Sequence, residues 1–277
     1  MTLEQTIHAN VTAALNEDVG SADLTALLLP EGKTATATIL CREEAVICGQ
    51  PWFNEVFRQV DPECKIEWAV AEGDFVAANT ILCHVSGKAR SLLTAERSAL
   101  NFVQLLSATA TLTKHYTEAI KPYTAKVMDT RKTIPGLRLA QKYAVKVGGG
   151  WNQRIGLYDG ILIKENHILA AGSIGLALKQ AYALAPDKTS IQIEVESLAE
   201  LEQALEAGAK LVLLDNMSLE DMRTAVVLTG DRAELEASGG VDLNSIREIA
   251  ATGVHRISIG KLTKDIQAID LSMRLLG

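Results

Sequence analysis

Several features that mark particular classes of protein are scarce in this chain of 277 residues. Aromatic residues make up only 4% of it, so the core must consist mostly of Ala, Leu, Val and Ile. No apolar run approaches the roughly 20 residues that a membrane-spanning helix needs. The first residues, Met1 to Gln5, lack the basic and apolar regions of a signal peptide. We therefore expect a cytoplasmic protein with no membrane partner.

Cysteine is also scarce, and the spacing of the four cysteines excludes the common metal and redox motifs. They form no C-x-x-C pair and have no nearby histidine at the spacing of a zinc site. Free cysteines are usually buried, so we expect reduced thiols in the core or in strands. The four residues are Cys41, Cys48, Cys64 and Cys83.

Positive charge is in the minority. The chain has 27 Lys and Arg against 34 Asp and Glu, which gives a net charge of −7. A negative chain lacks the general electrostatic surface that binds nucleic acid, so no nucleic-acid partner is expected. Any anionic ligand must instead be held by a local cluster of Arg and Lys.

The first hundred or so residues have a mixed pattern that predicts a small α+β domain. Helical spacing of apolar residues covers 3–18, and a long helical pattern covers 91–120. Short β-rich stretches lie between them, separated by turn signals such as Glu72-Gly73-Asp74. These stretches are 34–40, 44–48, 66–71 and 80–85.

From about Lys126 the pattern changes, and short apolar runs alternate with helical segments. Continuous apolar strands are typical of a parallel sheet covered on both faces, and six βα repeats favour a barrel or a doubly wound sheet. The expected strands are 126–129, 160–164, 190–195, 210–215, 233–237 and 255–260. The expected helices are 136–146, 173–185, 197–207, 218–229 and 242–252.

A barrel is favoured because a reactive or phosphate-binding group follows each expected strand. Barrel enzymes build their sites from the carboxyl ends of many strands. Strand ends also meet solvent and are polar for that reason, but this explains poorly why Glu194 lies inside an apolar run. The groups, in chain order, are Arg131 with Lys132, Lys164 with His167, Glu194 with Glu196, Asp215 with Asn216, Ser238-Gly239-Gly240, and Gly260-Lys261.

The loops after the last two strands, Ser238-Gly239-Gly240 and Gly260-Lys261, suit a phosphate. Glycine lets backbone N–H groups approach a phosphate closely, and barrels often bind phosphate at these loops. The alternative is a pair of ordinary glycine turns.

Two carboxylates, Glu194 and Asp215, end neighbouring expected strands. They would repel each other unless a cation lay between them, and Mg²⁺ takes oxygen ligands together with substrate phosphates. We expect Mg²⁺ as the cofactor for this reason. The alternative is a salt-bridge network in which the carboxylates form ion pairs with Lys164 and Arg131.

A cationic set in the first two βα units suits a small polyanionic substrate, because Arg binds carboxylates in bidentate fashion. Arg138 and Lys142 on the helix between the units are weaker members, since cations at i,i+4 usually form a solvated face. The glycines at 148–150 indicate either a mobile lid or a simple helix end. Arg97, in a long helix, looks by itself like a surface charge. The cationic set is Arg131, Lys132, Arg154 and Lys164.

Taken together, these motifs resemble the quinolinate phosphoribosyltransferase family, also called nicotinate-nucleotide pyrophosphorylase (carboxylating). Each segment alone is modest, but their order and spacing make the resemblance specific, and it covers nearly the whole chain. The segments are Glu17–Thr25, Ala95–Phe102, Asp129–Gly136, Gly148–Gly150, Leu162–His167, Glu194–Ser197, Leu213–Asn216, Glu236–Gly240 and Ile259–Gly260.

The resemblance implies an α/β fold with an N-terminal α/β sandwich domain, residues 1–108, and an open, incomplete α/β barrel of six to seven parallel strands, residues 109–265. The C-terminal segment 266–277 is expected to pack back on the first domain. Family members are homodimers, and some assemble into hexamers.

The implied activity transfers phosphoribosyl from phosphoribosyl pyrophosphate to quinolinate with decarboxylation, a step of NAD biosynthesis. The implied catalytic residues are Lys132, Lys164, Glu194 and Asp215, and the last two hold Mg²⁺ together with substrate phosphates. The implied substrate-binding residues are Arg97 from the neighbouring subunit, Arg131, Lys132, Gln153, Arg154, Lys164, His167, Ser238, Gly239, Gly240, Gly260 and Lys261.

One departure from the family pattern concerns Gln153, which stands where the glycine-rich loop usually continues to a His-Arg pair. A glutamine can donate a hydrogen bond to a carboxylate but carries no positive charge, so we expect weaker substrate binding rather than lost chemistry. Three other functions stay open: a relative that uses nicotinate or has lost activity, a lyase with a Schiff base on Lys164, and a phosphate-ligand sensor.

Overall fold

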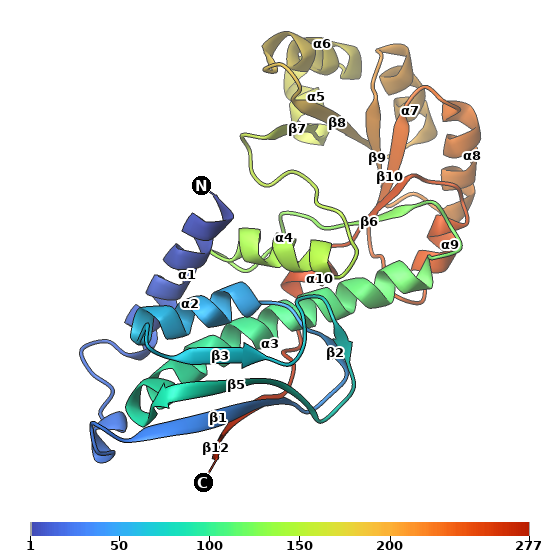
Figure 1. Ribbon diagram of the computed structural model, residues 1–277. Helices are drawn as coiled ribbons and strands as arrows, with labels where there is room; N and C mark the ends of the chain where they lie inside the picture. Colours follow the sequence, from blue (N-terminus) through green and yellow to red (C-terminus); the bar gives the residue numbers. More distant parts are fainter. Residues whose placement is uncertain (1, 277) are drawn as a thin grey trace. The chain divides into compact units, whose positions relative to one another are not determined.

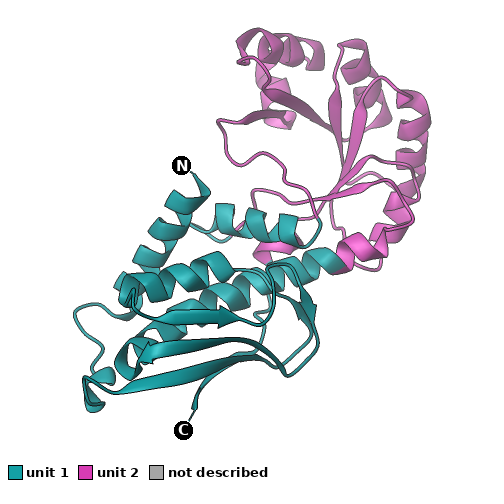
Figure 2. Cartoon of the chain, viewed as in Figure 1, with its two compact units in different colours: residues 1–114, 134–149, 265–277 teal, residues 115–133, 150–264 magenta. Residues whose placement is uncertain are grey.

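The structure, a computed structural model, describes residues 2–276, so the outermost residues of the expected domains, Met1 and Gly277, lie outside it. The chain forms two compact units (Figure 2). Unit 1 comprises 1–114, 134–149 and 265–277, and unit 2 comprises 115–133 and 150–264. The predicted boundary at 108/109 stays a prediction about where the domains begin and end.

Unit 1 is built on an antiparallel sheet with the order β12 (Leu271–Leu276), β1 (Thr34–Cys41), β5 (Thr80–Lys88) and β3 (Lys65–Trp68). Alternate residues of β1, namely Ala37, Ile39 and Cys41, are buried and face the core. Helices α2 (Gln50–Val60) and α3 (Ala89–Ala119) contribute to that core and lie over one face of the sheet (Figure 1).

The other elements of unit 1 have local causes in the sequence. Helix α1 (Leu3–Asp18) begins with a capping box between Thr2 and Gln5. Helix α4 is Arg138–Val147, and a short 3₁₀ turn covers Ala26–Leu28. Strands β2 (Ala45–Val46) and β4 (Phe75–Val76) form a separate antiparallel pair. The strand expected at 44–48 is therefore only two residues long.

Unit 2 contains six parallel strands in the spatial order β6-β11-β10-β9-β8-β7. If the two ends of this order are joined into a circle, the strands follow one another in chain order. Strands β6 and β7 are neighbours in that circle but do not pair, and we call the gap between them the seam. It is the order of an open barrel, as the sequence predicts. The strands are β6 (Lys126–Met128), β7 (Gly160–Ile163), β8 (Ser190–Val195), β9 (Leu211–Asp215), β10 (Glu234–Ser238) and β11 (Arg256–Ser258).

Helices connect these strands, and successive helices from α6 to α9 pack side by side along the sheet (Figure 1). Three of them begin at a serine whose hydroxyl accepts from a backbone N–H of the first turn: Ser173, Ser197 and Ser218. The helices are α5 (Glu165–Ala171), α6 (Ile174–Leu184), α7 (Leu198–Glu206), α8 (Leu219–Thr229), α9 (Ile246–Ala250) and α10 (Lys261–Lys264).

The predicted α/β class, with an N-terminal sheet domain and six parallel strands, is confirmed. Among the described residues no disulfide forms: three cysteines are buried and Cys64 is half-buried. Burial raises the pKa of Cys83 to about 12. No helix within residues 2–276 is long and apolar enough to cross a membrane.

Candidate active site

The carboxyl ends of the unit 2 strands surround a pocket of about 250 Å³. Residues spaced two apart along a strand point to the same face, and the lining residues of β7, β8 and β10 follow this spacing. All of the lining residues belong to unit 2. They are Thr130, Arg131, Lys132, Gln153, Arg154, Leu162, Lys164, Gln192, Glu194, Leu213, Glu236, Ser238 and Ser258.

The seam between β6 and β7 is spanned by the segment 151–154. Trp151 N donates to Val127 O at 2.8 Å, and Asp129 N donates to Trp151 O at 3.0 Å, as in a parallel ladder. At the other side, Arg154 Nη1 donates to Gly160 O at the start of β7 at 2.9 Å. The segment after the glycine-rich stretch is thus hydrogen-bonded to both edges, and it carries Gln153 and Arg154 into the pocket.

The glycine-rich stretch at 148–150 ends helix α4, and it does more than make the chain flexible at this point. Gly148 is the C-cap, and a Cβ at this position would overlap with Ala110 O. Gly149 has φ of 88°, the left-handed region that glycine adopts without strain. The interpretation as a simple helix end accounts for these glycines.

The predicted cationic set comes together in the pocket. Arg131, Lys132, Arg154 and Lys164 all line it, from three separate segments of the chain. Burial, and after it the neighbouring positive charge of Arg131, lowers the pKa of the Arg154 guanidinium. Two neighbouring guanidinium groups repel each other, which is the arrangement expected of a site for a polyanion.

One of the two predicted carboxylates, that of Glu194, forms an ion pair with a lysine. Lys164 Nζ lies 2.6 Å from Glu194 Oε2, and the side chain of Glu194 is only 13% exposed. This is the salt bridge that the sequence left open as an alternative. His167 accepts a hydrogen bond from Lys164 N at 3.0 Å through Nδ1, and so caps α5. His167 does not line the pocket.

The other predicted carboxylate, Asp215, ends β9 beside Ser238 of β10. Asn216, with φ of 53°, donates from Nδ2 to Asp215 Oδ2 at 2.9 Å and from its backbone N to Ser238 O at 2.9 Å. Gly239 follows, with φ of 110°, and a Cβ there would overlap with Asn216 Oδ1. The Ser-Gly-Gly turn therefore requires glycine, and it places Ser238 at the pocket wall.

The Gly260-Lys261 loop lies at the same edge of the sheet. A Cβ on Gly260 would come within 3.1 Å of Lys132 Cδ, so the loop packs against that side chain. Thr263, on the short helix α10, donates from its hydroxyl to Lys132 O at 2.8 Å. Lys261 and Gly240 are outside the pocket lining.

The floor of the pocket contains polar groups that the sequence did not single out. Glu236 is 1% exposed, and its Oε2 accepts from Gln192 Nε2 at 3.0 Å and from Gln153 Nε2. Gln153 N also donates to Asp129 Oδ1 at 2.8 Å. The amide of Gln153 is thus directed to this floor, whereas the sequence suggested a direct hydrogen bond to a substrate carboxylate. The signal in the sequence that could have indicated this floor is the carboxylate of Glu236, two residues before Ser238 on an apolar strand.

Two cationic residues of interest lie in unit 1. Arg97 is exposed on α3, as expected for a surface charge. Lys142 is only 1% exposed, so the expected solvated face on α4 is wrong for this residue. The i,i+4 spacing with Arg138 predicted a surface pair, but burial on α4 extends beyond the face of Ala140 and Ala144 to position 142.

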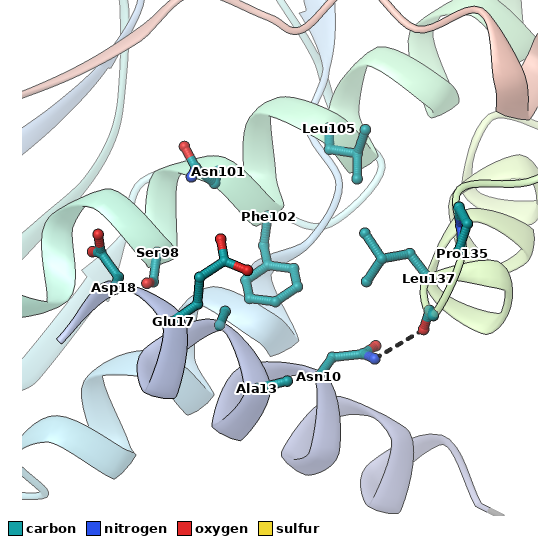
Figure 3. Close-up of a pocket in the computed structure, with 12 residues that line it drawn as sticks. Asn10, Ala13, Glu17, Asp18, Ser98, Asn101, Phe102, Leu105, Pro135 and Leu137 are labelled. Carbon is teal, nitrogen blue, oxygen red and sulfur yellow. Dashed lines mark hydrogen bonds between the residues drawn. The ribbon is translucent and has the colours of Figure 1, made fainter. Parts of the chain in front are cut away.

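Unit 1 contains a pocket of its own, of about 370 Å³, between α1, α3 and the segment 135–137 (Figure 3). Asn10 Nδ2 donates to Gly136 O across it at 3.1 Å. Of the described residues that line it, none is Lys or Arg, and two, Glu17 and Asp18, are acidic. It is therefore unsuited to an anionic substrate, and the cationic pocket of unit 2 is the candidate site.

The acidic residues are compatible with Mg²⁺ in one particular mode. No group of three or more His, Cys, Asp or Glu residues that could hold a metal occurs among the described residues. Glu194 and Asp215 instead offer two carboxylates from adjacent parallel strands. Mg²⁺ commonly takes one or two protein carboxylates and completes its shell with water and substrate phosphates, so the donor set fits a metal that arrives with a phosphorylated substrate.

Six parallel strands in barrel order, with a cationic pocket and two carboxylates at their carboxyl edge, define a barrel enzyme for small anionic substrates. Two family models match: Quinolinate phosphoribosyl transferase, N-terminal domain, over residues 23–107, and the C-terminal domain of the same name over residues 109–274. The chain belongs to the quinolinate phosphoribosyltransferase family.

Individual relatives agree with this assignment. A probable nicotinate-nucleotide pyrophosphorylase [carboxylating] of Bacillus subtilis is 38% identical, over 93% of this chain and 89% of its own. A chloroplastic nicotinate-nucleotide pyrophosphorylase [carboxylating] of rice, Oryza sativa, is 39% identical, over 97% and 77%. The solved nicotinate-nucleotide pyrophosphorylase of Francisella tularensis is 46% identical with a TM-score of 0.96, over 100% of this chain and 98% of that one.

Proposed function

We propose that this chain transfers the phosphoribosyl group of phosphoribosyl pyrophosphate to quinolinate, with loss of CO₂, and forms nicotinate mononucleotide and pyrophosphate. The observation that carries the proposal is the convergence of Arg131, Lys132 and Arg154 on one pocket with the Lys164–Glu194 pair at its rim. A dicarboxylate needs such a clamp, and the relatives named above are nicotinate-nucleotide pyrophosphorylases by name.

In the proposed reaction the pyridine nitrogen of quinolinate attacks ribose C1. The C1–O bond to pyrophosphate breaks, and pyrophosphate leaves with that electron pair. The carboxylate beside the ring nitrogen then leaves as CO₂, its bonding pair passes to the ring carbon next to the cationic nitrogen, and that carbon takes up a proton. No protein nucleophile is needed, so positioning and electrostatics carry the rate.

The side chains of this chain have separate tasks in that reaction. Arg131, Lys132 and Arg154 hold the two carboxylates and fix the ring. Glu194 and Asp215 oppose the positive charge that develops on C1 and the ribose ring oxygen. The 5′-phosphate binds at the Ser238-Gly239-Gly240 turn and the Gly260-Lys261 loop, where backbone N–H groups and a lysine are available.

Glu194 and Asp215 are also the residues that would hold Mg²⁺. When bound, the metal supplies neutralisation of charge on the departing pyrophosphate. We propose further that the protein acts as a homodimer in which Arg97 of the partner subunit completes each site. The exposed position of Arg97 on α3 is compatible with this role.

A lyase that forms a Schiff base is less well supported. Such an enzyme needs the free amine of Lys164, but Lys164 Nζ forms an ion pair with Glu194. Borohydride trapping of a carbonyl substrate on Lys164 would favour the lyase.

The direct test mixes purified protein, Mg²⁺, phosphoribosyl pyrophosphate and quinolinate, and follows nicotinate mononucleotide and CO₂. We expect both products in equal amounts, and neither in the presence of EDTA. Product from nicotinate in place of quinolinate, without CO₂, would move the protein to the sister activity. No product from either acid would overturn the proposal.

One substitution tests whether the activity depends on the pocket. Arg131→Ala should reduce kcat/KM by a factor of about 100 or more, the usual effect of losing one preorganised charge contact. Arg223→Ala, at an exposed position of α8, is the matched control and should behave as the wild type. Normal kcat/KM for Arg131→Ala would contradict the assignment of this residue.

A further inference from the structure

The layer of side chains beneath the pocket is unusually polar for a barrel interior. Such interiors are normally filled by branched apolar residues. Here Gln192 is 5% exposed, Glu236 is 1% exposed and Ser258 is 6% exposed, and all three line the pocket from three different strands. A buried carboxyl group below a site for a dicarboxylate is unfavourable unless it serves a purpose, because like charges in a poorly hydrated pocket repel strongly.

The two carboxyl oxygens of Glu236 differ in their hydrogen-bond partners. Oε2 accepts from two neutral amides, Gln192 and Gln153, while the buried Oε1 accepts from neither of them. This pattern suits a neutral carboxyl group whose carbonyl oxygen is Oε2, since that oxygen accepts from two neutral amides and from no cation. No Lys or Arg forms an ion pair with Glu236 among the described residues.

The charged groups around Glu236 do not enforce its ionisation. Burial raises the pKa of Glu236, and this effect is opposed, in decreasing order, by Gln192, Gln153, Ser258 and Arg256. Arg256, on β11, is paired with Glu234. The remaining charges face the pocket from other segments: Arg131, Lys132, Arg154, and Lys164 paired with Glu194.

We propose that Glu236 determines substrate specificity as an uncharged carboxylic acid: in its protonated form it admits a dicarboxylate to the pocket, and its ionisation repels that ligand. The inference rests on the proposed function, and it gives a role to the side chain of Glu236 in the floor of the same site. The four cations of the wall attract the dianion, and the neutral floor leaves that attraction undiminished.

The proposal predicts a particular dependence on pH. The KM for quinolinate, at saturating Mg²⁺ and phosphoribosyl pyrophosphate, should be constant at low pH and rise above a break by up to about tenfold per pH unit, since one proton is lost. Between about pH 6 and 9 both carboxyl groups of the free ligand are already ionised, so the break belongs to the protein. The KM for phosphoribosyl pyrophosphate should show no matching break.

Two variants separate this role from a structural one. Glu236→Gln keeps shape and cannot ionise, so its KM for quinolinate should stay at the low-pH value across the range. Gln192→Leu removes a donor that favours the ionised form, so its break should move to higher pH; damage to the pocket would instead weaken binding at every pH. Glu248→Gln, at an exposed position of α9 and outside the pocket lining, is the control and should keep the wild-type break.

A monocarboxylate adds a check on the mechanism. Nicotinate, measured as a competitive inhibitor, has one charge fewer, so its inhibition constant should rise less with pH than the KM for quinolinate. A flat wild-type KM, a Glu236→Gln profile as steep as that of the wild type, or a break in Gln192→Leu that stays in place or moves down would each overturn the inference while the proposed reaction stands. Absence of turnover with quinolinate in the wild type would overturn the proposed function itself.

Discussion

Lys164 Nζ and Glu194 Oε2 lie 2.6 Å apart across the neighbouring strands β7 and β8. The lysine side chain is 48% exposed, and pairs of this kind contribute only about 0–1 kcal/mol to stability. The position of the pair at the pocket rim is therefore better explained by function than by folding. Each partner holds the other in place at the rim.

Glu194→Gln tests this separation of function from stability. The amide keeps the shape of the side chain but neither opposes positive charge on the ribose nor binds Mg²⁺ well, so kcat should fall by a factor of about 100 to 1,000. The midpoint of thermal unfolding should change little. Glu196→Gln, exposed just beyond the same strand, should leave kcat unchanged. A large loss of thermal stability in Glu194→Gln would show that the pair is structural.

Adjacent glycines provide a second, closely matched test. Gly239 and Gly240 both have positive φ, but an added Cβ would overlap with Asn216 Oδ1 at Gly239 and would meet nothing within 4 Å at Gly240. Gly240→Ala should therefore cost only the backbone strain, about 1–2 kcal/mol. Gly239→Ala should cost more and should also raise the KM for phosphoribosyl pyrophosphate, because the turn beside Ser238 must move. Unfolding in urea and steady-state kinetics measure the two effects, and equal behaviour of the variants would contradict the close packing.

Gln153→His restores the residue usual in the family. We expect a similar turnover and a lower KM for quinolinate, because an imidazole can add positive charge at the pocket wall. A protonated imidazole in that place would also favour the ionised carboxyl group of Glu236, whose negative charge would offset part of the gain, so the fall in KM should be modest. Steady-state kinetics with quinolinate check the prediction, and a collapse of turnover would contradict it.

Much of the fold followed from short-range patterns. The six parallel strands were recognisable because each is a short apolar run, such as 211–214, between helical segments, and the pocket residues were recognisable because they follow those runs. Helix α2 was missed although Trp52, Phe53, Val56 and Phe57 recur with helical spacing. That signal was available in the sequence.

Other features depend on contacts between distant residues. Gln153 and Glu236 are 83 positions apart, and neither an amide after a glycine-rich stretch nor a lone carboxylate in a strand indicates its partner. The burial of Lys142 depends on which face of α4 turns inward, and charge spacing alone suggested the opposite. Likewise, glycine content at 148–150 could not distinguish a mobile lid from a simple helix end.

The last prediction concerns stability and the same buried carboxyl group. Because burial raises the pKa of Glu236 in the folded protein, folding binds its proton more tightly than the unfolded chain does. Its contribution to stability is therefore complete below the unfolded pKa, near 4.5, and is lost as pH rises through the folded pKa, with a slope of up to about 1.4 kcal/mol per pH unit. Glu236→Gln lacks this loss, so the free energy of unfolding of the variant should rise relative to the wild type between about pH 5 and 8. Urea unfolding at several pH values, with Glu248→Gln on the exposed face of α9 as the control, measures the difference. Parallel profiles for Glu236→Gln and the wild type would show that the carboxyl group is already ionised in the folded protein at the lower pH, and that the floor of the pocket carries a negative charge.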